Sequence, residues 1–128
     1  MSTLGIGHIN LRASAEIIER MRRFYVDVVG LREGSRPNFR SGSHGHWLYA
    51  GDVDVLHLSI RNDGVSGTCA TGAFGHMAFA IDDLAAAQAR LDAAGVPYET
   101  DIVDERHQVQ LFLADPAGVG VELTFTDP

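Results

Sequence analysis

The first half of the chain has its apolar and polar positions arranged for a strand, a helix and further strands. Residues 4–12 largely alternate between the two kinds, as in a strand with one buried face. Ser14 then stands where a helix N-cap belongs, and apolar residues recur at helical spacing up to Gly30, a natural C-cap. After a stretch rich in Gly and Ser, residues 46–50 and 53–60 predict two strands joined by a Gly-Asp turn.

The second half repeats this order of elements. Residues 74–81 alternate like the first strand, Asp82 or Asp83 can cap a helix, and Gly95 can end it. Three more strands are predicted at residues 98–103, 108–114 and 119–126. The prediction is a single α+β domain, residues 1–128, built from two tandem βαβββ modules at about residues 4–60 and 73–126.

Four polar residues occupy equivalent positions in the two modules. Gly-His-Ile-Asn-Leu at residues 7–11 matches Gly-His-Met-Ala-Phe at residues 75–79, so His8 corresponds to His76. In the last strand of each module, His57 corresponds to Glu122. The separation is 49 residues from His8 to His57 and 46 residues from His76 to Glu122, which supports a true repeat.

Side chains at these four positions should project away from the apolar residues that face the helices, so they can converge on the opposite side of the sheets. Three imidazoles and a carboxylate suit a divalent first-row metal ion. Each histidine, taken alone, also fits a hydrogen-bonded structural residue. Glu122 differs, because a buried carboxylate between Val121 and Leu123 needs a partner or a metal.

Composition narrows the classes of function. All ten basic residues are Arg, which excludes a lysine Schiff base and a P-loop, and six His remain for proton transfer or metal binding. The net charge of −7 disfavours binding to nucleic acids or anionic membranes. Cys69 is the only cysteine, and no apolar run is long enough to span a bilayer. With no signal-peptide pattern at the N-terminus, we expect a cytoplasmic protein.

The chain resembles the vicinal oxygen chelate superfamily over roughly residues 4–126. This superfamily includes glyoxalase I, bleomycin resistance proteins, fosfomycin-resistance enzymes, methylmalonyl-CoA epimerase and extradiol dioxygenases. The resemblance is carried by four segments, at residues 7–9, 24–31, 75–79 and 110–123. It implies a glyoxalase-like fold, in which the modules form a cupped mixed β-sheet with the helices on the outside.

The resemblance also implies a metal centre. The family's ligand positions fall on His8, His57, His76 and Glu122, which would hold one divalent ion per site: Ni, Zn, Co, Mn or Fe. His57 departs from the pattern of glyoxalase I, where the equivalent position is typically Glu or Gln. His57 is therefore open to two roles, metal ligand or base, and His57 and Glu122 are the candidate catalytic residues for proton transfer.

Three functions remain open. The first is a metal-dependent lyase or isomerase of the glyoxalase type. The second is an Fe(II) extradiol dioxygenase; His57 favours it, whereas Phe112 stands where that group carries a Tyr, and His107 is too close for the usual spacing. The third is a binding or resistance protein without turnover, which is least favoured because all four ligand positions are kept.

Five further residues are candidates for contact with a small-molecule substrate: Trp47, Tyr49, His107, Gln110 and Phe112. The aromatic residues among them fit an ordinary core role equally well. His44 and His46 are expected to be solvated and uninvolved. Two modules leave sheet edges to cover and members of the superfamily commonly dimerise, so we predict a homodimer.

Overall fold

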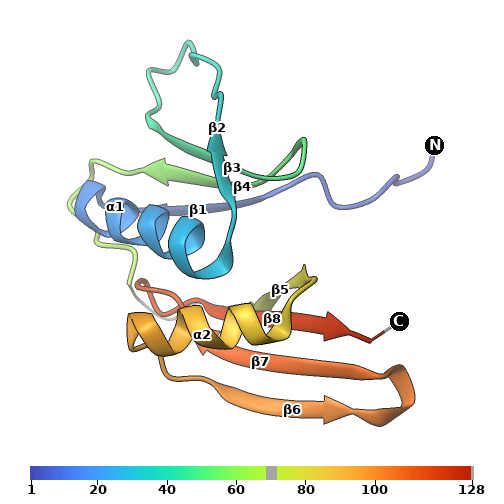
Figure 1. The fold of residues 1–128 in the computed structure, drawn as a ribbon. Helices are drawn as coiled ribbons and strands as arrows, with labels where there is room; N and C mark the ends of the chain where they lie inside the picture. Colours follow the sequence, from blue (N-terminus) through green and yellow to red (C-terminus); the bar gives the residue numbers. More distant parts are fainter. Residues whose placement is uncertain (69–71, 128) are drawn as a thin grey trace.

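A computed structural model describes residues 1–68 and 72–127 of the chain, so Cys69 lies outside the described residues. Its elements follow the predicted repeat (Figure 1). The first module contains β1 (Ile9–Ala13), α1 (Ala15–Phe24), η1 (Tyr25–Val29), β2 (Arg32–Gly34), β3 (Gly45–Ala50) and β4 (Val53–Ile60). The second contains β5 (His76–Ile81), α2 (Leu84–Ala94), β6 (Glu99–Val103), η2 (Asp104–Arg106), β7 (Gln108–Ala114) and β8 (Gly120–Thr126).

Each module forms its own four-stranded mixed sheet. The strand orders are β1-β4-β3-β2 and β5-β8-β7-β6. The first and last strands of each module pair in parallel, whereas the other pairs are antiparallel. The predicted tandem βαβββ organisation is confirmed. Because β1 and β5 are edge strands, each leaves one side of its backbone without a sheet partner.

Both helices begin where the caps predict, and α2 also ends as predicted at Gly95, which has a φ of 66°. The Ser14 hydroxyl accepts a hydrogen bond from the Ile17 amide at 3.4 Å, and an Asp83 carboxylate oxygen accepts one from the Ala86 amide at 2.9 Å. The first helix does not stay α-helical to Gly30, because η1 is a π-helical turn that ends at this glycine with a φ of 92°. Within the described part of the chain, no helix is long and apolar enough to cross a membrane.

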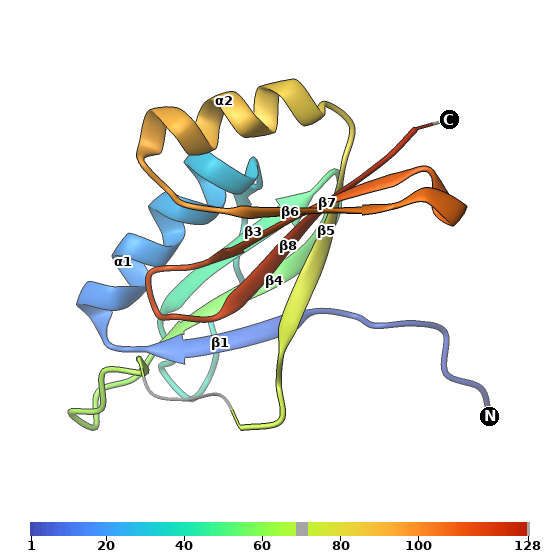
Figure 2. The same ribbon diagram turned by 90° about the horizontal axis from the view of Figure 1, so that it is seen from below.

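The core lies where the helices cover the sheets, and both helices lie on one side of the strands (Figure 2). Alternation along the strands decides which residues enter it. Leu56 and Leu58 of β4, and Val121 and Leu123 of β8, are fully or almost fully buried. His57 and Glu122 stand between them in sequence and therefore belong to the opposite faces of the two sheets.

One buried hydrogen bond joins the modules. The hydroxyl of Tyr25, in η1, donates to Asp115 Oδ2 at 2.6 Å, across 90 residues of sequence. Tyr25 is fully buried, and burial, followed by the nearby Asp115 charge, raises the pKa of its hydroxyl well above its usual range. The hydroxyl therefore remains a donor. Asp115 Oδ1 also accepts hydrogen bonds from the Ala117 and Val119 amides, which fixes the turn between β7 and β8.

Replacing Tyr25 with Phe should lower the free energy of unfolding by about 1–3 kcal/mol, because Asp115 Oδ2 loses a donor in a buried position. Urea unfolding followed by circular dichroism measures this loss. Tyr49→Phe is the matched control, since its hydroxyl donates to the Ser35 carbonyl in an exposed position and should cost about 1 kcal/mol or less. Equal losses in the two variants would show that the hydrogen bond between the modules has no special weight.

Candidate functional site

The first group of predicted site residues lies on the open face of the first sheet. Neighbouring strands place Asn10 and Trp47 on either side of His57 in the sheet register. His8 precedes β1 and reaches the same face, because it is two residues before Asn10. These residues are therefore brought together by strand pairing between segments far apart in sequence.

The rings of this group form a continuous stack. The His57 ring lies between His8, whose ring centroid is 3.8 Å away at an interplanar angle of 18°, and Trp47, at 4.0 Å and 5°. Phe39, from the loop before β3, also contacts Trp47, with ring centroids 6.3 Å apart at an interplanar angle of 52°. His57 is consequently only 9% exposed, and its ring plane is fixed from both sides.

Asp54 is a functional candidate that the sequence reasoning missed. His57 Nε2 lies 2.6 Å from Asp54 Oδ2, and this hydrogen bond lowers the pKa of the Asp54 carboxyl. Residues three apart on a regular strand point to opposite faces, so alternation gave no signal for this pair. The register between β3 and β4 shifts here, leaving Asp54 and Val55 together opposite Tyr49. Such a bulge can turn a side chain toward the other face.

The second group lies on the open face of the second sheet. Glu122, in β8, is 7% exposed, and its Oε1 lies 3.3 Å from His76 Nε2. The Thr124 hydroxyl donates a short hydrogen bond to the other carboxylate oxygen, Oε2. The His76 and Phe112 rings form a T-shaped contact with 5.7 Å between centroids. The partners that a buried carboxylate requires are thus His76 and Thr124.

Of the two groups, the second has the geometry of two ligands that bind one ion. Ligand atoms about 2.1 Å from a metal and at right angles to each other lie about 3 Å apart, close to the separation of His76 Nε2 and Glu122 Oε1. His8 and His57 do not fit one ion together, because the nitrogen lone pairs of nearly parallel stacked rings do not converge. Across residues 1–68 and 72–127, no three His, Cys, Asp or Glu side chains are grouped to hold a metal.

The other predicted residues are dispersed. The Arg32 guanidinium lies over the Tyr49 ring, with its Cζ atom 5.0 Å from the ring centroid. Gln110 donates to Gln108 Oε1 at 3.1 Å on the second sheet. His107 is exposed, follows η2 in the left-handed region with a φ of 51°, and belongs to neither group. His46, expected to be uninvolved, forms a pair with Glu33 outside both groups.

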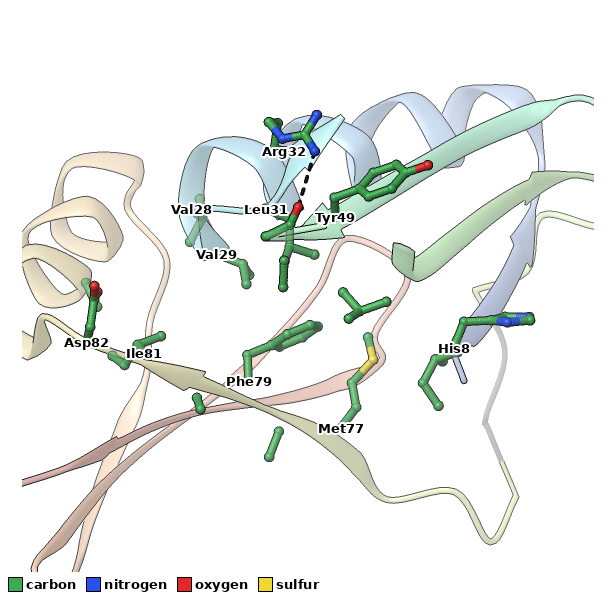
Figure 3. A pocket seen from close by; sticks show the side chains of 18 of the residues that line it. His8, Val28, Val29, Leu31, Arg32, Tyr49, Met77, Phe79, Ile81 and Asp82 are labelled. Atoms are coloured by element: carbon green, nitrogen blue, oxygen red, sulfur yellow. Dashed lines mark hydrogen bonds between the residues drawn. The ribbon is translucent and has the colours of Figure 1, made fainter. Parts of the chain in front are cut away.

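A cleft of about 1390 Å³ separates the two modules (Figure 3). Its walls are largely apolar and include Leu31 from the first module and Met77 and Phe79 from β5, with His8 at one end. Of the four predicted ligand positions, only His8 and His76 line it. His57 and Glu122 belong to the faces turned away from the helices, so the cleft alone does not constitute the predicted centre.

Comparison with known proteins identifies the fold. The family model described as "Glyoxalase/Bleomycin resistance protein/Dioxygenase superfamily" matches residues 5–123. A putative glyoxalase family protein from Bacillus anthracis superposes with a TM-score of 0.75 at 20% identity, covering 99% of this chain and 98% of that chain. A glyoxylase/bleomycin resistance protein/dioxygenase domain from Frankia sp. EAN1pec gives 0.74 at 17% identity, covering 98% and 100%.

A lactoylglutathione lyase from Agrobacterium tumefaciens gives a TM-score of 0.67 at 24% identity, covering 97% of this chain and 95% of that chain. At these identities the structural matches establish the fold and leave the activity open. No curated protein sequence matches this chain significantly.

Replacing Glu122 with Gln should change the free energy of unfolding by no more than about 1 kcal/mol, because the amide keeps an acceptor for Thr124 and removes a buried charge. Chemical denaturation measures the effect. Leu123→Ala, at the neighbouring core position, should cost about 2–5 kcal/mol. A comparable loss in Glu122→Gln would mean that the carboxylate is retained for stability and not for chemistry.

Proposed function

Because the chain belongs to the glyoxalase/bleomycin resistance protein/dioxygenase superfamily, we propose that it is a divalent-metal-dependent lyase or isomerase acting on a small molecule with two neighbouring oxygens. The observation that carries this proposal is the contact between His76 Nε2 and Glu122 Oε1 on an otherwise open sheet face. We also propose that the protein is cytoplasmic.

His8, His76 and Glu122 are the residues that would hold the ion. A divalent ion bound there would polarise the two substrate oxygens and make a neighbouring C–H bond more acidic. Two His and one carboxylate accept Ni, Zn, Co, Mn or Fe, so the ion is decided by availability as well as by the ligands. Thr124 supports the set, because its hydrogen bond orients the Glu122 carboxylate.

We propose further that the complete centre forms between two copies of the chain. His8 lies with the first-sheet group, whereas His76 and Glu122 form the second, so one chain supplies two incomplete halves. The segment before β1 projects from the body, with Leu4 99% and Ile6 86% exposed (Figure 2). Exposed apolar side chains beside the unpaired edges of β1 and β5 favour a homodimer.

The chain's own groups would bind the substrate and move its proton. His57 and Glu122 are the candidate proton carriers. Trp47, Gln110 and Phe112 are on the same open faces as these two groups, in register with His57, Thr124 and Glu122 respectively, and are proposed to contact the substrate. Tyr49, which lines the cleft, and the exposed His107, which follows η2, are proposed to contact the substrate outside the two groups.

An Fe(II) extradiol dioxygenase is the second candidate. The set of two His and one carboxylate with open positions is the one that non-haem iron oxygenases use. Phe112 packs against His76 and has no hydroxyl to offer at the position where those enzymes carry a Tyr. The lyase or isomerase therefore ranks first.

Protein prepared without a His tag should bind one divalent ion per chain, and His76→Ala and Glu122→Ala should each abolish that binding. Metal analysis and metal-dependent thermal shifts measure both effects. His46→Ala is the control, because His46 lies outside both groups and should leave metal content unchanged. Parent-like metal content in the His76 and Glu122 variants would refute the proposed centre.

Activity of the loaded protein then separates the candidates. Conversion of the hemithioacetal of methylglyoxal and glutathione, or of a related α-oxygenated carbonyl, without oxygen supports the lyase. Oxygen-dependent yellow products from catechols with bound iron support the dioxygenase. Tight ligand binding without conversion in either test supports a binding protein.

A centre shared between copies can be tested by complementation. Neither His8→Ala nor Glu122→Ala should bind metal at the parent level alone. Co-expression of the two variants should restore up to one complete centre per heterodimer, because one of its two centres then contains neither substitution. A control pairing of His76→Ala with Glu122→Ala should restore nothing, since both residues come from the same half. Absence of recovery in the first pairing would place the centre within one chain.

A further inference from the structure

We propose that His57 is the proton acceptor of this centre and not one of its metal ligands, and that Asp54 is a positioning residue which sets the orientation and tautomer of the His57 ring. This inference rests on the proposed function and deepens it. It decides between the two roles that the sequence leaves open for His57.

The first argument concerns the tautomer of His57. Its Nε2 lies 2.6 Å from Asp54 Oδ2. An ionised carboxylate can only accept a hydrogen bond, so Nε2 must carry the hydrogen. In the neutral ring, Nδ1 then holds the free lone pair and is the atom able to take a proton. Asp54 thus fixes which nitrogen is the base.

The second argument concerns access to that nitrogen. Within the described residues, Nδ1 of His57 takes part in no hydrogen bond, whereas every fully buried side-chain nitrogen or oxygen there has a partner. Nδ1 is therefore not sealed inside the protein, although the residue as a whole is only 9% exposed. The nitrogen that Asp54 leaves unprotonated is thus also the one whose hydrogen-bonding position is free.

The third argument concerns the ring plane. His8 and Trp47 cover the two faces of the His57 ring at 3.8 and 4.0 Å between centroids. A proton can approach only in the plane of the ring, toward Nδ1. The same stack prevents His8 and His57 from directing lone pairs at one ion. His8 lines the same cleft as His76, whereas His57 does not, so we assign binding of the ion to His8 and proton transfer to His57.

The proposed step is a balanced proton shift. His57 Nδ1 takes the proton from a carbon next to a carbonyl, and the C–H electron pair moves into the substrate toward the carbonyl oxygen. The imidazolium that forms keeps its Nε2–H on the Asp54 carboxylate, which stabilises the positive charge. His57 then returns the proton to the former carbonyl carbon, and the hydroxyl hydrogen passes from its oxygen to the neighbouring one. Substrate and product are therefore isomers in which the carbonyl and hydroxyl groups have exchanged carbons.

The first test measures, in the metal-free protein, the effect of the Asp54 contact on the His57 ring. Nitrogen-15 NMR of histidine-labelled protein should show the His57 ring with its hydrogen on Nε2. Asp54→Asn should shift the ring toward a mixture of tautomers. Asp52→Asn, the same substitution in the exposed turn before β4, should leave the parent signal. A parent ring with its hydrogen on Nδ1, or an unchanged ring in Asp54→Asn, would overturn the positioning role.

The second test separates base from ligand. His57→Gln should bind nickel or cobalt at the parent stoichiometry, whereas turnover of whichever substrate the loaded parent converts should fall by about 10²–10⁴-fold. Asp54→Asn should lower kcat by about 10–100-fold with KM unchanged. Added imidazole should restore part of the turnover to His57→Ala. Loss of metal from His57→Gln would make His57 a ligand and overturn the inference.

The two tests also separate this inference from the proposed function. A parent that binds no divalent ion overturns the proposed function, and with it the proton-acceptor role. The tautomer measurement needs neither metal nor substrate, so it still decides whether Asp54 positions His57. If the metal-bound parent is active and its His57→Gln variant turns over at the same rate, the metal centre is supported. The role of His57 as proton acceptor is then refuted.

Discussion

The hydrogen bond from Tyr25 to Asp115 is the interaction on which the relation between the two modules depends. It joins the π-helical turn after α1 to the turn between β7 and β8, and both residues are buried. The same Asp115 carboxylate holds that turn through the Ala117 and Val119 amides. The turn sets where β8 begins, and β8 carries Glu122. A contact far from the open faces therefore fixes the position of the carboxylate on one of them.

Alternation along the same strands then determines both which residues enter the core and which residues face the site. In β4, Leu56 and Leu58 pack toward the helix and leave His57 on the other face. In β8, Val121 and Leu123 do the same for Glu122. A slip of one residue in either strand would bury the polar group and expose two apolar ones, which burial strongly opposes. The stability of the core thus holds the site residues in their register.

Because the core holds the site residues in register, part of the fold and of the site could be predicted from the sequence. Periodicity and the internal repeat predict the two modules and the helix caps. They also predict that His8 and His57 lie on the same side of the sheet, because both alternate along their strands with apolar residues that face the helix. The Asp54 contact depends on a bulge in β4, and the ring stack depends on Trp47 arriving from a neighbouring strand. The π-helical turn that begins at Tyr25 makes its hydrogen bond to Asp115 of the second module. Such features arise from contacts between segments, which periodicity does not report.

The separation of the two groups has a thermodynamic consequence for the proposed centre. His76 and Glu122 present two polar atoms 3.3 Å apart, and in the proposed centre His8 of another copy would add a third ligand. An ion held by both halves binds the assembled form more tightly than either half alone. By linkage, the ion then favours assembly as much as assembly favours the ion. Metal loading, subunit association and the placing of His57 beside the substrate would therefore be one coupled equilibrium, in which the repeat supplies two half-sites and the second copy unites them.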